Sequence, residues 1–364
     1  METILGVMDA IESSLLGVHS ERCVMVRNRN ATCAKCAEVC TTKAISFAAE
    51  GIEIDEALCI GCGTCATACP TCALEAKNPL DKELSALCRE KLKASSGLVE
   101  LSCSSYVGAK QRNETPDVMC MGRLDESLFV ELCLAGCTQV ILHTGDCERC
   151  THASGGALAR KVMESAQNLL GAFGKTVEIE ITHEPDFKAE QASEVSLIKE
   201  KVARAQTADE PSFEHVNKQG TLSHYVPHRR KRLFKLMELL GEPVCDHLET
   251  RLWGEVSIDT EVCKSCQMCA VFCPTGALKK IGTRKERGTR LGLEHYPVLC
   301  LQCRICESIC PASAIKVSDK VELSNFFDTG GKHIELKPLD WTPNEPDSIW
   351  RKTMSRIGGN YTAF

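Results

Sequence analysis

One pattern of cysteines recurs three times along the chain and limits what the chain can fold into. The stretch CIGCGTCATACP at 59–70 returns as CKSCQMCAVFCP at 263–274 and as CLQCRICESICP at 300–311. Each copy has the spacing C-x2-C-x2-C-x3-C-P. The first three cysteines can wrap a tight loop around one face of a 4Fe–4S cube, which needs one thiolate per iron. We expect the fourth cysteine to start a helix that leads away, so that its sulfur reaches a second cluster and the proline occupies the first helical turn.

The second and third copies form a pair. Residues of about 255–320 resemble a bacterial two-cluster ferredoxin domain, in which the fourth cysteine of each motif completes the other cluster. The resemblance implies two clusters, one held by Cys263, Cys266, Cys269 and Cys310, and the other by Cys300, Cys303, Cys306 and Cys273. Zinc ribbons are the alternative, but they use paired C-x2-C motifs without the third and fourth members. A basic insert, LKKIGTRKERGTR, separates the two motifs and either favours cluster reduction or forms a contact surface.

The first copy needs a partner half, and the stretch before it is the only candidate. Three of its cysteines keep the later spacings, and Cys23 replaces the missing first cysteine, with VMVRNRNAT as an inserted loop. By the same resemblance, one cluster is held by Cys23, Cys33, Cys36 and Cys69, and the other by Cys59, Cys62, Cys65 and Cys40. If the loop cannot fold back, the cluster at Cys23 loses a ligand and becomes a labile three-iron form. Thr41 replaces the family proline, and we interpret Cys72 as a small buried thiol.

Length, cysteine content and net charge limit the class of protein that this chain can be. The chain has 364 residues, enough for two or three domains, and 25 cysteines. Its net charge of −6 argues against nucleic acid as the main ligand. The N-terminal stretch has no basic region typical of a secretory signal, and no apolar run reaches the roughly 20 residues of a membrane span. We therefore expect a cytoplasmic protein with reduced thiols, in which clustered cysteines indicate metal.

The middle of the chain predicts a different kind of domain. Strands are expected at 97–101, 117–120, 138–143 and 176–181, with helices at 125–136 and 155–173. Alternating strands and helices indicate a small α/β domain with a parallel sheet, whose ligands bind at the carboxyl ends of the strands. Four cysteines follow the predicted strands and so are expected at that edge: Cys103, Cys120, Cys147 and Cys150.

This domain resembles the iron–sulfur subunit family of methyl-viologen-reducing hydrogenase and heterodisulfide reductase. The segments that carry the resemblance are CSSYVGA (103–109), VMCMGRLDESLF (118–129) and LHTGDCERC (142–150). The resemblance implies a fifth iron–sulfur site at the four cysteines, either 2Fe–2S or 4Fe–4S. It is partial, because Leu142 stands where another family cysteine is expected, and we expect Cys150 to compensate for it. A cluster-free docking domain and a zinc site remain alternatives.

The other singled-out residues have structural interpretations. We expect His143 and Asp146 to flank the sheet edge, with Asp146 in a turn. Cys133 and Cys137 are expected in the core, and Cys88 and Cys245 as core or surface residues. The sequence has no phosphate loop, hydrolase elbow or HExxH motif, so we expect no catalysis by the chain alone.

The expected fold class is α+β, with two two-cluster ferredoxin-like domains flanking the small α/β domain. The predicted boundaries are 1–95 and 246–335 for the ferredoxin-like domains, 96–184 for the α/β domain, 185–245 for a helical linker and 336–364 for an aromatic tail. The basic stretch HRRKRLFKLMELLGEP that closes the linker is expected to start a helix with a solvated charged face, with a docking patch as the alternative.

These features predict an electron-transfer subunit with four 4Fe–4S clusters and a possible fifth. The arrangement resembles iron–sulfur proteins that serve molybdopterin enzymes such as formate dehydrogenase, and those of hydrogenase and heterodisulfide reductase systems in anaerobes. That resemblance implies a redox enzyme as partner. A redox sensor or an assembly factor for an anaerobic oxidoreductase is the alternative function, and a zinc-stapled scaffold is a third.

Overall fold

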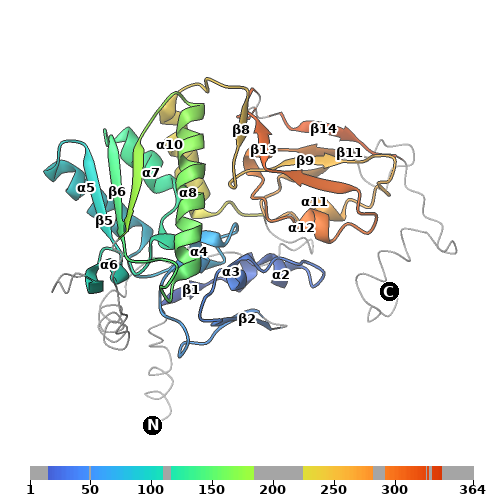
Figure 1. Cartoon of the computed structure of the whole chain (residues 1–364). Helices are drawn as coiled ribbons and strands as arrows, with labels where there is room; N and C mark the ends of the chain where they lie inside the picture. The colour runs from blue at the N-terminus through green and yellow to red at the C-terminus, as the bar shows by residue number, and fades with distance from the viewer. Residues whose placement is uncertain are drawn as a thin grey trace, which may run out of the picture.

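The computed structural model describes residues 15–48, 51–109, 116–183, 224–281, 292–324, 326–327 and 330–337. Three predictions fall partly or wholly outside these ranges. They are the linker up to residue 223, the basic insert beyond Ile281 and the aromatic tail from residue 338 onward. Within the described residues, helices and strands are mixed and the sheets are small, one of them parallel (Figure 1).

The N-terminal unit contains two antiparallel strand pairs and three short helices among the described residues. The pairs join β1 (Leu16–Val18) to β4 (Leu74–Ala76) and β2 (Ile45–Ala48) to β3 (Gly51–Ile54). The helices are α2 (Val24–Arg27), α3 (Lys35–Glu38) and α4 (Thr64–Ala68), and a 3₁₀ turn, Ser20–Arg22, precedes α2. The strand before the first cysteine motif therefore pairs with the strand after the second, which closes the unit around both motifs.

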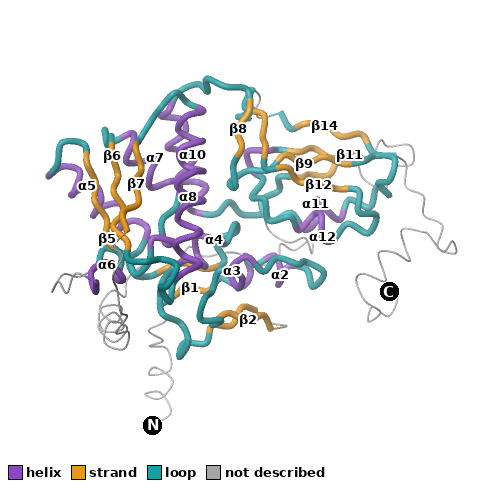
Figure 2. The backbone as a smooth tube through the Cα atoms, in the orientation of Figure 1, coloured by secondary structure: helices purple, strands orange, loops and turns teal. Residues whose placement is uncertain are grey.

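The C-terminal unit repeats this plan. Strand β9 (Glu255–Ile258) pairs with β12 (Ile315–Ser318), and β10 (Leu278–Ile281) pairs with β11 (Gly292–His295), which also pairs with β14 (Lys332–Glu335). Its helices are α11 (Met268–Phe272) and α12 (Ile305–Ser308), with a 3₁₀ turn at Pro297–Leu299. A further pair, β8 (His247–Glu249) with β13 (Lys320–Glu322), adjoins the unit. Figure 2 shows the strands of this unit stacked above α11 and α12.

The short helices do not begin where the cysteine spacing predicted. We expected each fourth cysteine to start a helix, but α4 ends at Ala68 and α11 ends at Phe272, so that Cys69 and Cys273 cap these helices. The prolines that follow therefore stand beyond a helix end rather than in a first turn. Proline fits there because it has no amide hydrogen and cannot continue a helix.

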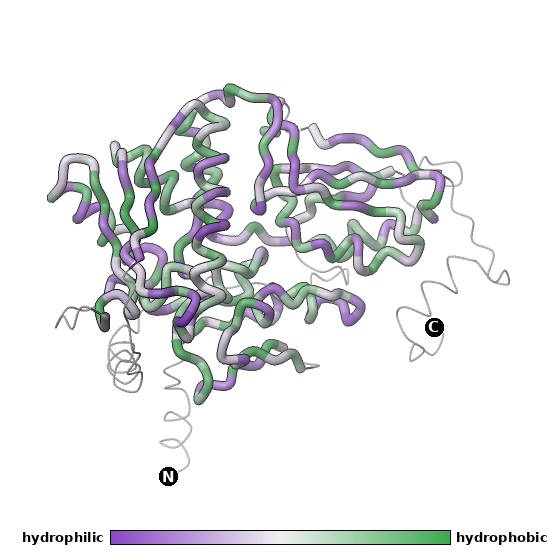
Figure 3. Tube along the Cα trace, viewed as in Figure 1, coloured by the Kyte–Doolittle hydropathy of each residue, from purple (hydrophilic) through white to green (hydrophobic). Residues whose placement is uncertain are grey.

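The middle unit contains a three-stranded parallel sheet in the order β5 (Leu98–Ser102), β6 (Gln139–Thr144) and β7 (Glu178–His183). Helices α7 (Glu126–Leu134) and α8 (Ala153–Ala172) connect the strands, and α5 (Asp81–Ala94) precedes the sheet. Buried side chains alternate along β5 and β6, and one core joins them to α5, α7, α8 and α10 (His228–Leu240). Figure 3 shows hydrophobic and hydrophilic residues interspersed along the upright α8, as expected for a helix with one buried face.

The parallel sheet confirms the prediction for this region, with two differences. The stretch 117–120 forms no strand, because Val118 makes only a single parallel bridge to Cys103 before a short 3₁₀ turn, Met121–Arg123. A short helix, α6 (Ser104–Ala109), follows β5 instead.

The basic helix α10 differs more strongly from the prediction, which gave it a charged face exposed to solvent. In α10, Leu233, Met237 and Leu240 are buried, and so is Arg230 with a relative exposure of 7%. Arg229 makes an ion pair with Asp125, with 3.2 Å between its Nε and the carboxylate oxygen. The predicted linker therefore contributes a core helix, and Arg229 faces inward to the buried carboxylate of Asp125.

Across the described residues, we find no helix with the length and apolar character needed to cross a membrane.

Candidate iron–sulfur sites

The structure brings the sixteen ferredoxin-motif cysteines together in four groups of four. We call them the first set (Cys23, Cys33, Cys36, Cys69), the second set (Cys40, Cys59, Cys62, Cys65), the third set (Cys263, Cys266, Cys269, Cys310) and the fourth set (Cys273, Cys300, Cys303, Cys306). Each set combines three cysteines of one motif with the fourth cysteine of the paired motif.

The electrostatics of the thiols show this grouping. In the first set, burial raises the pKa of Cys23, Cys33 and Cys36, and the charge of Cys69 adds to the rise in each. In the second set, the charge of Cys40 acts in the same way on its three partners. Cys310 does so in the third set and Cys273 in the fourth.

The thiols of these sets cannot all ionise without a compensating cation. Burial and neighbouring thiolates raise the pKa of Cys36 to about 12. For Cys300, burial dominates and raises the pKa to about 11. Four thiolates crowded in a buried site repel one another, whereas iron ions would neutralise them. The donor set therefore fits an iron–sulfur cluster, whose ligands are four cysteine thiolates.

Two left-handed residues shape the loop of three of the four motifs. Gly61, Ser265 and Gln302 share the position two residues after the first cysteine, with φ of 66°, 54° and 50°. Gly63, Gln267 and Arg304 follow the second cysteine and also have positive φ. These turns wrap the backbone around the sulfurs, and the amide of Ser265 donates to Cys263 Sγ at 3.4 Å. Such hydrogen bonds to cluster sulfurs are one of the levers that set reduction potential.

The first motif departs from this loop shape, as its insertion requires. Ala34 follows Cys33 with a φ of −122° instead of a positive value. The inserted residues fold as α2, which begins directly after Cys23, and the amide of Arg27 donates to the Cys23 carbonyl. The chain then returns to Cys33, and Cys23 lies close enough for the charges of Cys33 and Cys69 to raise its pKa in addition to burial. The insertion therefore does not displace Cys23 from the first set.

Each fourth cysteine is followed, three residues later, by a residue with positive φ. These residues are Lys43, Cys72, Gly276 and Ser313. At two of the sites the next amide donates back to the cysteine sulfur, from Ala73 to Cys69 and from Ala314 to Cys310, both at 3.3 Å. Cys72 is 4% exposed, and burial raises its pKa to about 12, as expected for a small buried thiol. Its place is one that glycine adopts without strain, which explains the small residue expected there.

A fifth set gathers at the carboxyl edge of the parallel sheet (Cys103, Cys120, Cys147, Cys150). Cys103 directly follows β5, and Cys147 comes three residues after β6. Burial raises the pKa of Cys120, and the charges of Cys103 and Cys150 add to the rise. Burial also raises the pKa of Cys103, to which the charge of Cys147 contributes. All four predicted ligands therefore meet at one edge.

Paired glycines at the start of α8 let the helix approach these sulfurs. A methyl group at Gly155 would overlap Cys120 Sγ, and one at Gly156 would lie 2.9 Å from Cys147 Sγ. The sequence analysis missed these glycines. Their signal is their position, five and six residues after Cys150, where a helix begins against a cysteine-bearing loop.

The remaining residues take structural roles. His143 stacks on Tyr106 with ring centroids 4.9 Å apart and bonds Thr182, while Asp146 accepts from the amide of Glu148 in a turn. Among the other cysteines, Cys88 and Cys137 are buried, Cys133 is half-buried and Cys245 is exposed. In the described part of the chain, no three His, Cys, Asp or Glu side chains are close enough to hold a single metal ion. A cluster does not need that closeness, because each thiolate binds a different iron.

Comparison with known protein families supports the two ferredoxin-type units. Residues 262–314 match a 4Fe-4S dicluster domain, and residues 52–75 match a 4Fe-4S binding domain. The first match contains the third and fourth sets entire, and the second contains Cys59, Cys62, Cys65 and Cys69. No curated protein matches the chain. The resemblance of the middle unit to the hydrogenase and heterodisulfide reductase subunit stays a prediction. The chain thus carries two ferredoxin-type 4Fe–4S domains.

Proposed function

We propose that the chain is an electron-transfer subunit that relays single electrons between a donor and an acceptor. The first to fourth sets would each hold a 4Fe–4S cluster, and the fifth set would hold a 2Fe–2S or 4Fe–4S cluster. Each bound cluster supplies one-electron redox chemistry, which the protein positions and tunes. The observation that carries the proposal is the order of the five sets: neighbouring sets are close enough for the charge of a cysteine in one to raise the pKa of a cysteine in the next.

Four pairs of cysteines link the row. The charge of Cys62 contributes to the raised pKa of Cys120, behind burial, and so joins the fifth set to the second. Within the ferredoxin-type units, Cys36 acts on Cys65, and Cys269 acts on Cys306. The charge of Cys33 acts on Cys303 and joins the first set to the fourth. The resulting order is fifth, second, first, fourth and third.

The interface between the segments that carry the fifth and second sets is tightly packed. Helix α4, which carries Cys65, lies against the turn that follows Cys120. Methyl groups at Gly122 and Gly155 would lie 2.7 and 3.0 Å from Thr64 Oγ1, so only glycine fits there without a shift. The hydroxyl of Thr67 donates to the carbonyl of Arg123 at 2.9 Å. This contact holds the two sets at a fixed separation.

The interface between the segments that carry the first and fourth sets is apolar. Val24, Ala31, Ile305 and Ile309 form a small buried cluster against which Cys33 and Cys303 pack. At its edge, Lys35 donates from Nζ to the carbonyl of Gln302 at 3.0 Å. The two ferredoxin-type units therefore meet at the sides that carry these sets, as expected if an electron passes between them.

The partner and the compartment are part of the proposal. We expect no catalysis by the chain alone and a redox enzyme as its partner, of the molybdopterin, hydrogenase or heterodisulfide reductase kind, in the cytoplasm. The support is the resemblance in residues 103–150 and the absence of catalytic motifs from the sequence, so the identity of the partner rests on likeness.

The experiment that tests the proposal cycles the loaded protein, purified without oxygen, through about ten rounds of reduction and oxidation. A relay keeps its iron and, when fully reduced, shows magnetic coupling between clusters in its EPR spectrum. A sensor or an assembly factor would instead lose iron from the first set or pass it to an added apo-ferredoxin. Retained iron without any coupling would contradict the row of sets.

A further inference from the structure

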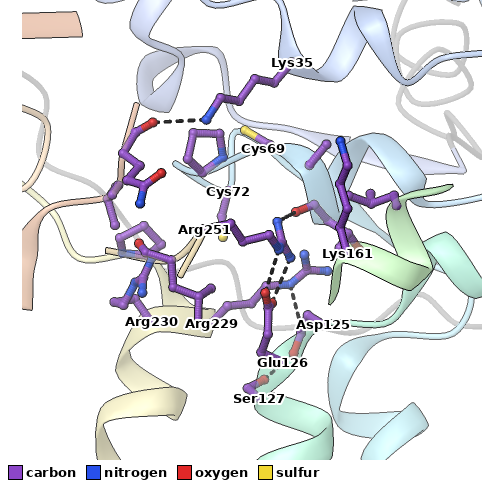
Figure 4. A pocket seen from close by; sticks show the side chains of 18 of the residues that line it. Lys35, Cys69, Cys72, Asp125, Glu126, Ser127, Lys161, Arg229, Arg230 and Arg251 are labelled. Carbon is purple, nitrogen blue, oxygen red and sulfur yellow. Dashed lines mark hydrogen bonds and ion pairs between the residues drawn. The ribbon is translucent and has the colours of Figure 1, made fainter. Parts of the chain in front are cut away.

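Three cations from other parts of the chain reach the fourth set. The first is Lys35 on α3, whose Nζ donates to the carbonyl of Gln302 at 3.0 Å. Gln302 lies between Cys300 and Cys303 in the sequence, so this hydrogen bond fixes an ammonium group beside the loop of the fourth set. Figure 4 shows the cavity at the meeting of the units, in which a dashed line marks this hydrogen bond from Lys35.

The second cation is Arg27, the last residue of α2 and part of the insertion in the first motif. Helix α2 contributes Val24 to the apolar cluster at the interface of the first and fourth sets. Burial lowers the pKa of Arg27, and the charges of Tyr225, Cys273 and Cys303 act in the opposite direction. The inserted residues therefore place a guanidinium close to two cysteines of the fourth set.

The third cation is Arg230 on α10, which is 7% exposed. Its guanidinium stacks over Trp253 at 4.7 Å from the ring centroid, and one terminal nitrogen donates to the Leu252 carbonyl. The next residue, Gly254, lies so close to the fourth set that an added methyl group would be 3.2 Å from Cys300 Sγ. Burial raises the pKa of Cys300, and the charge of Arg230 acts against this rise.

Arg230 makes no ion pair in the described part of the chain. Burial lowers its pKa, and the charges of Glu126, Cys72 and Cys300 oppose this. Glu126 already forms a bidentate ion pair with Arg251, with N–O distances of 2.6 and 2.8 Å, and burial raises the pKa of Cys72 to about 12. A buried guanidinium costs free energy unless negative charge lies near it, and a cluster bound at Cys300 supplies that charge.

The other four sets have carboxylates close to them. Behind burial, the charge of one carboxylate raises the pKa of a cysteine in each of these sets: Glu38 at Cys33, Glu56 at Cys59, Asp259 at Cys263 and Asp146 at Cys147. Lys35 and Arg160 act against two of these carboxylates. In the fourth set, the charges that act on the thiols are those of other cysteines and of Arg230.

Positive charge beside a cluster favours its reduced form, which carries one more negative charge. The fourth set lies between the first and the third, whose clusters would repel an added electron. Those clusters lie behind their own ligands, whereas the three cations stand beside the ligands or the loop of the fourth set itself. Because the interaction between charges weakens with distance, the cations have the larger effect.

We propose that the cluster of the fourth set has the highest reduction potential of the four ferredoxin-type clusters, set by Arg27, Lys35 and Arg230. The inference rests on the proposed binding of clusters by these sets. A chain that has accepted one electron would hold it at the fourth set, inside the row and not at either end. The insertion in the first motif then has a function, because it places Arg27 beside the cluster of another unit.

Redox titration of the loaded full chain without oxygen, followed by EPR, tests the proposal. The first cluster to be reduced should give the spectrum of a single uncoupled cluster, and Cys303→Ser should change that signal, since Cys303 belongs to the fourth set. In Arg27→Gln, the ratio of reduced to oxidised cluster at a fixed potential should fall about tenfold, which is about 59 mV for a one-electron couple. Lys35→Gln should lower the same potential.

Arg29→Gln is the matched control, because Arg29 is an exposed arginine of the same insertion, and its potentials should equal those of the wild type. Arg230→Gln should lower the potential of the fourth set, with Lys231→Gln, exposed on the same helix, as its control. If Arg230→Gln does not fold, the variants at the half-buried Arg27 and Lys35 still decide.

Three results would overturn the proposal: a first signal that Cys303→Ser leaves unchanged, wild-type potentials in Arg27→Gln, or equal shifts in Arg27→Gln and Arg29→Gln. Failure of the relay would look different. Clusters that keep this order of potentials but show no magnetic coupling when fully reduced would contradict the row and leave the order standing.

Discussion

Replacing Gly155 by alanine tests whether the fifth set holds a cluster. The added methyl group would overlap Cys120 Sγ and come within 3.0 Å of Thr64 Oγ1. Both neighbours are fixed, since Cys120 is 6% and Thr64 is 1% exposed. The sulfur would have to move away from the set, and overpacking of this kind costs about 1–3 kcal/mol. A cost of that size leaves the fold intact, but the displacement that causes it moves the sulfur of one cluster ligand, Cys120.

We therefore expect Gly155→Ala to fold and to lose the fifth cluster alone. Iron per chain should fall by about two to four, depending on the cluster type, and the four other sets should keep theirs. Iron and acid-labile sulfide analysis on oxygen-free protein gives the count. Gly171→Ala in the same helix is the matched control, because a methyl group there meets nothing within 4 Å. A Gly155→Ala protein with the iron count and EPR spectrum of the wild type would refute the reasoning.

Three further changes test other parts of the account. Cys23→Ser should remove one iron per chain and give the EPR signal of a three-iron cluster, and an unchanged spectrum would show that Cys23 is no ligand. Cys72→Ala should leave the iron count unchanged, because its sulfur belongs to no set, and a loss of about four irons would contradict this. Asp81→Asn should lower the free energy of unfolding by about 3 kcal/mol in oxygen-free denaturant titration, because it removes a carboxylate that pairs with Arg123 and Arg229. Glu90→Gln, exposed on the same helix, should change little, and equal stability of the two variants would argue against the buried ion pairs.

The cysteine sets are the part of the site that the sequence predicts best. Spacing alone indicates the loops of the motifs, and the resemblance to two-cluster ferredoxins predicts that Cys310 joins Cys263 and that Cys69 joins Cys33. The structure groups them in that way. It differs on the local helices, because the spacing does not say on which side of the fourth cysteine a helix lies. The closing strand pair, β9 with β12, depends on contacts far apart in the sequence.

The interfaces between the units could not be predicted from the sequence. Nothing near Cys62 indicates that Cys120 lies beside it, because that contact depends on how α4 packs against the middle unit. The same holds for Arg229 and Arg230, whose sequence context HRRKR is typical of a solvated helix start. Arg229 pairs with Asp81 and Asp125, carboxylates more than 100 residues earlier in the chain, and Arg230 stacks on Trp253. An ion pair between residues so far apart in the chain leaves no pattern in the local sequence.

The central claim is that five cysteine sets hold clusters in one row. The most direct test is the iron and acid-labile sulfide content per chain of protein purified without oxygen, together with EPR of the reduced sample. The account predicts about 18 to 20 irons with matching sulfide and magnetically coupled clusters. About sixteen irons would contradict a cluster in the fifth set, and eight or fewer, with zinc in the remaining sites, would contradict the whole row.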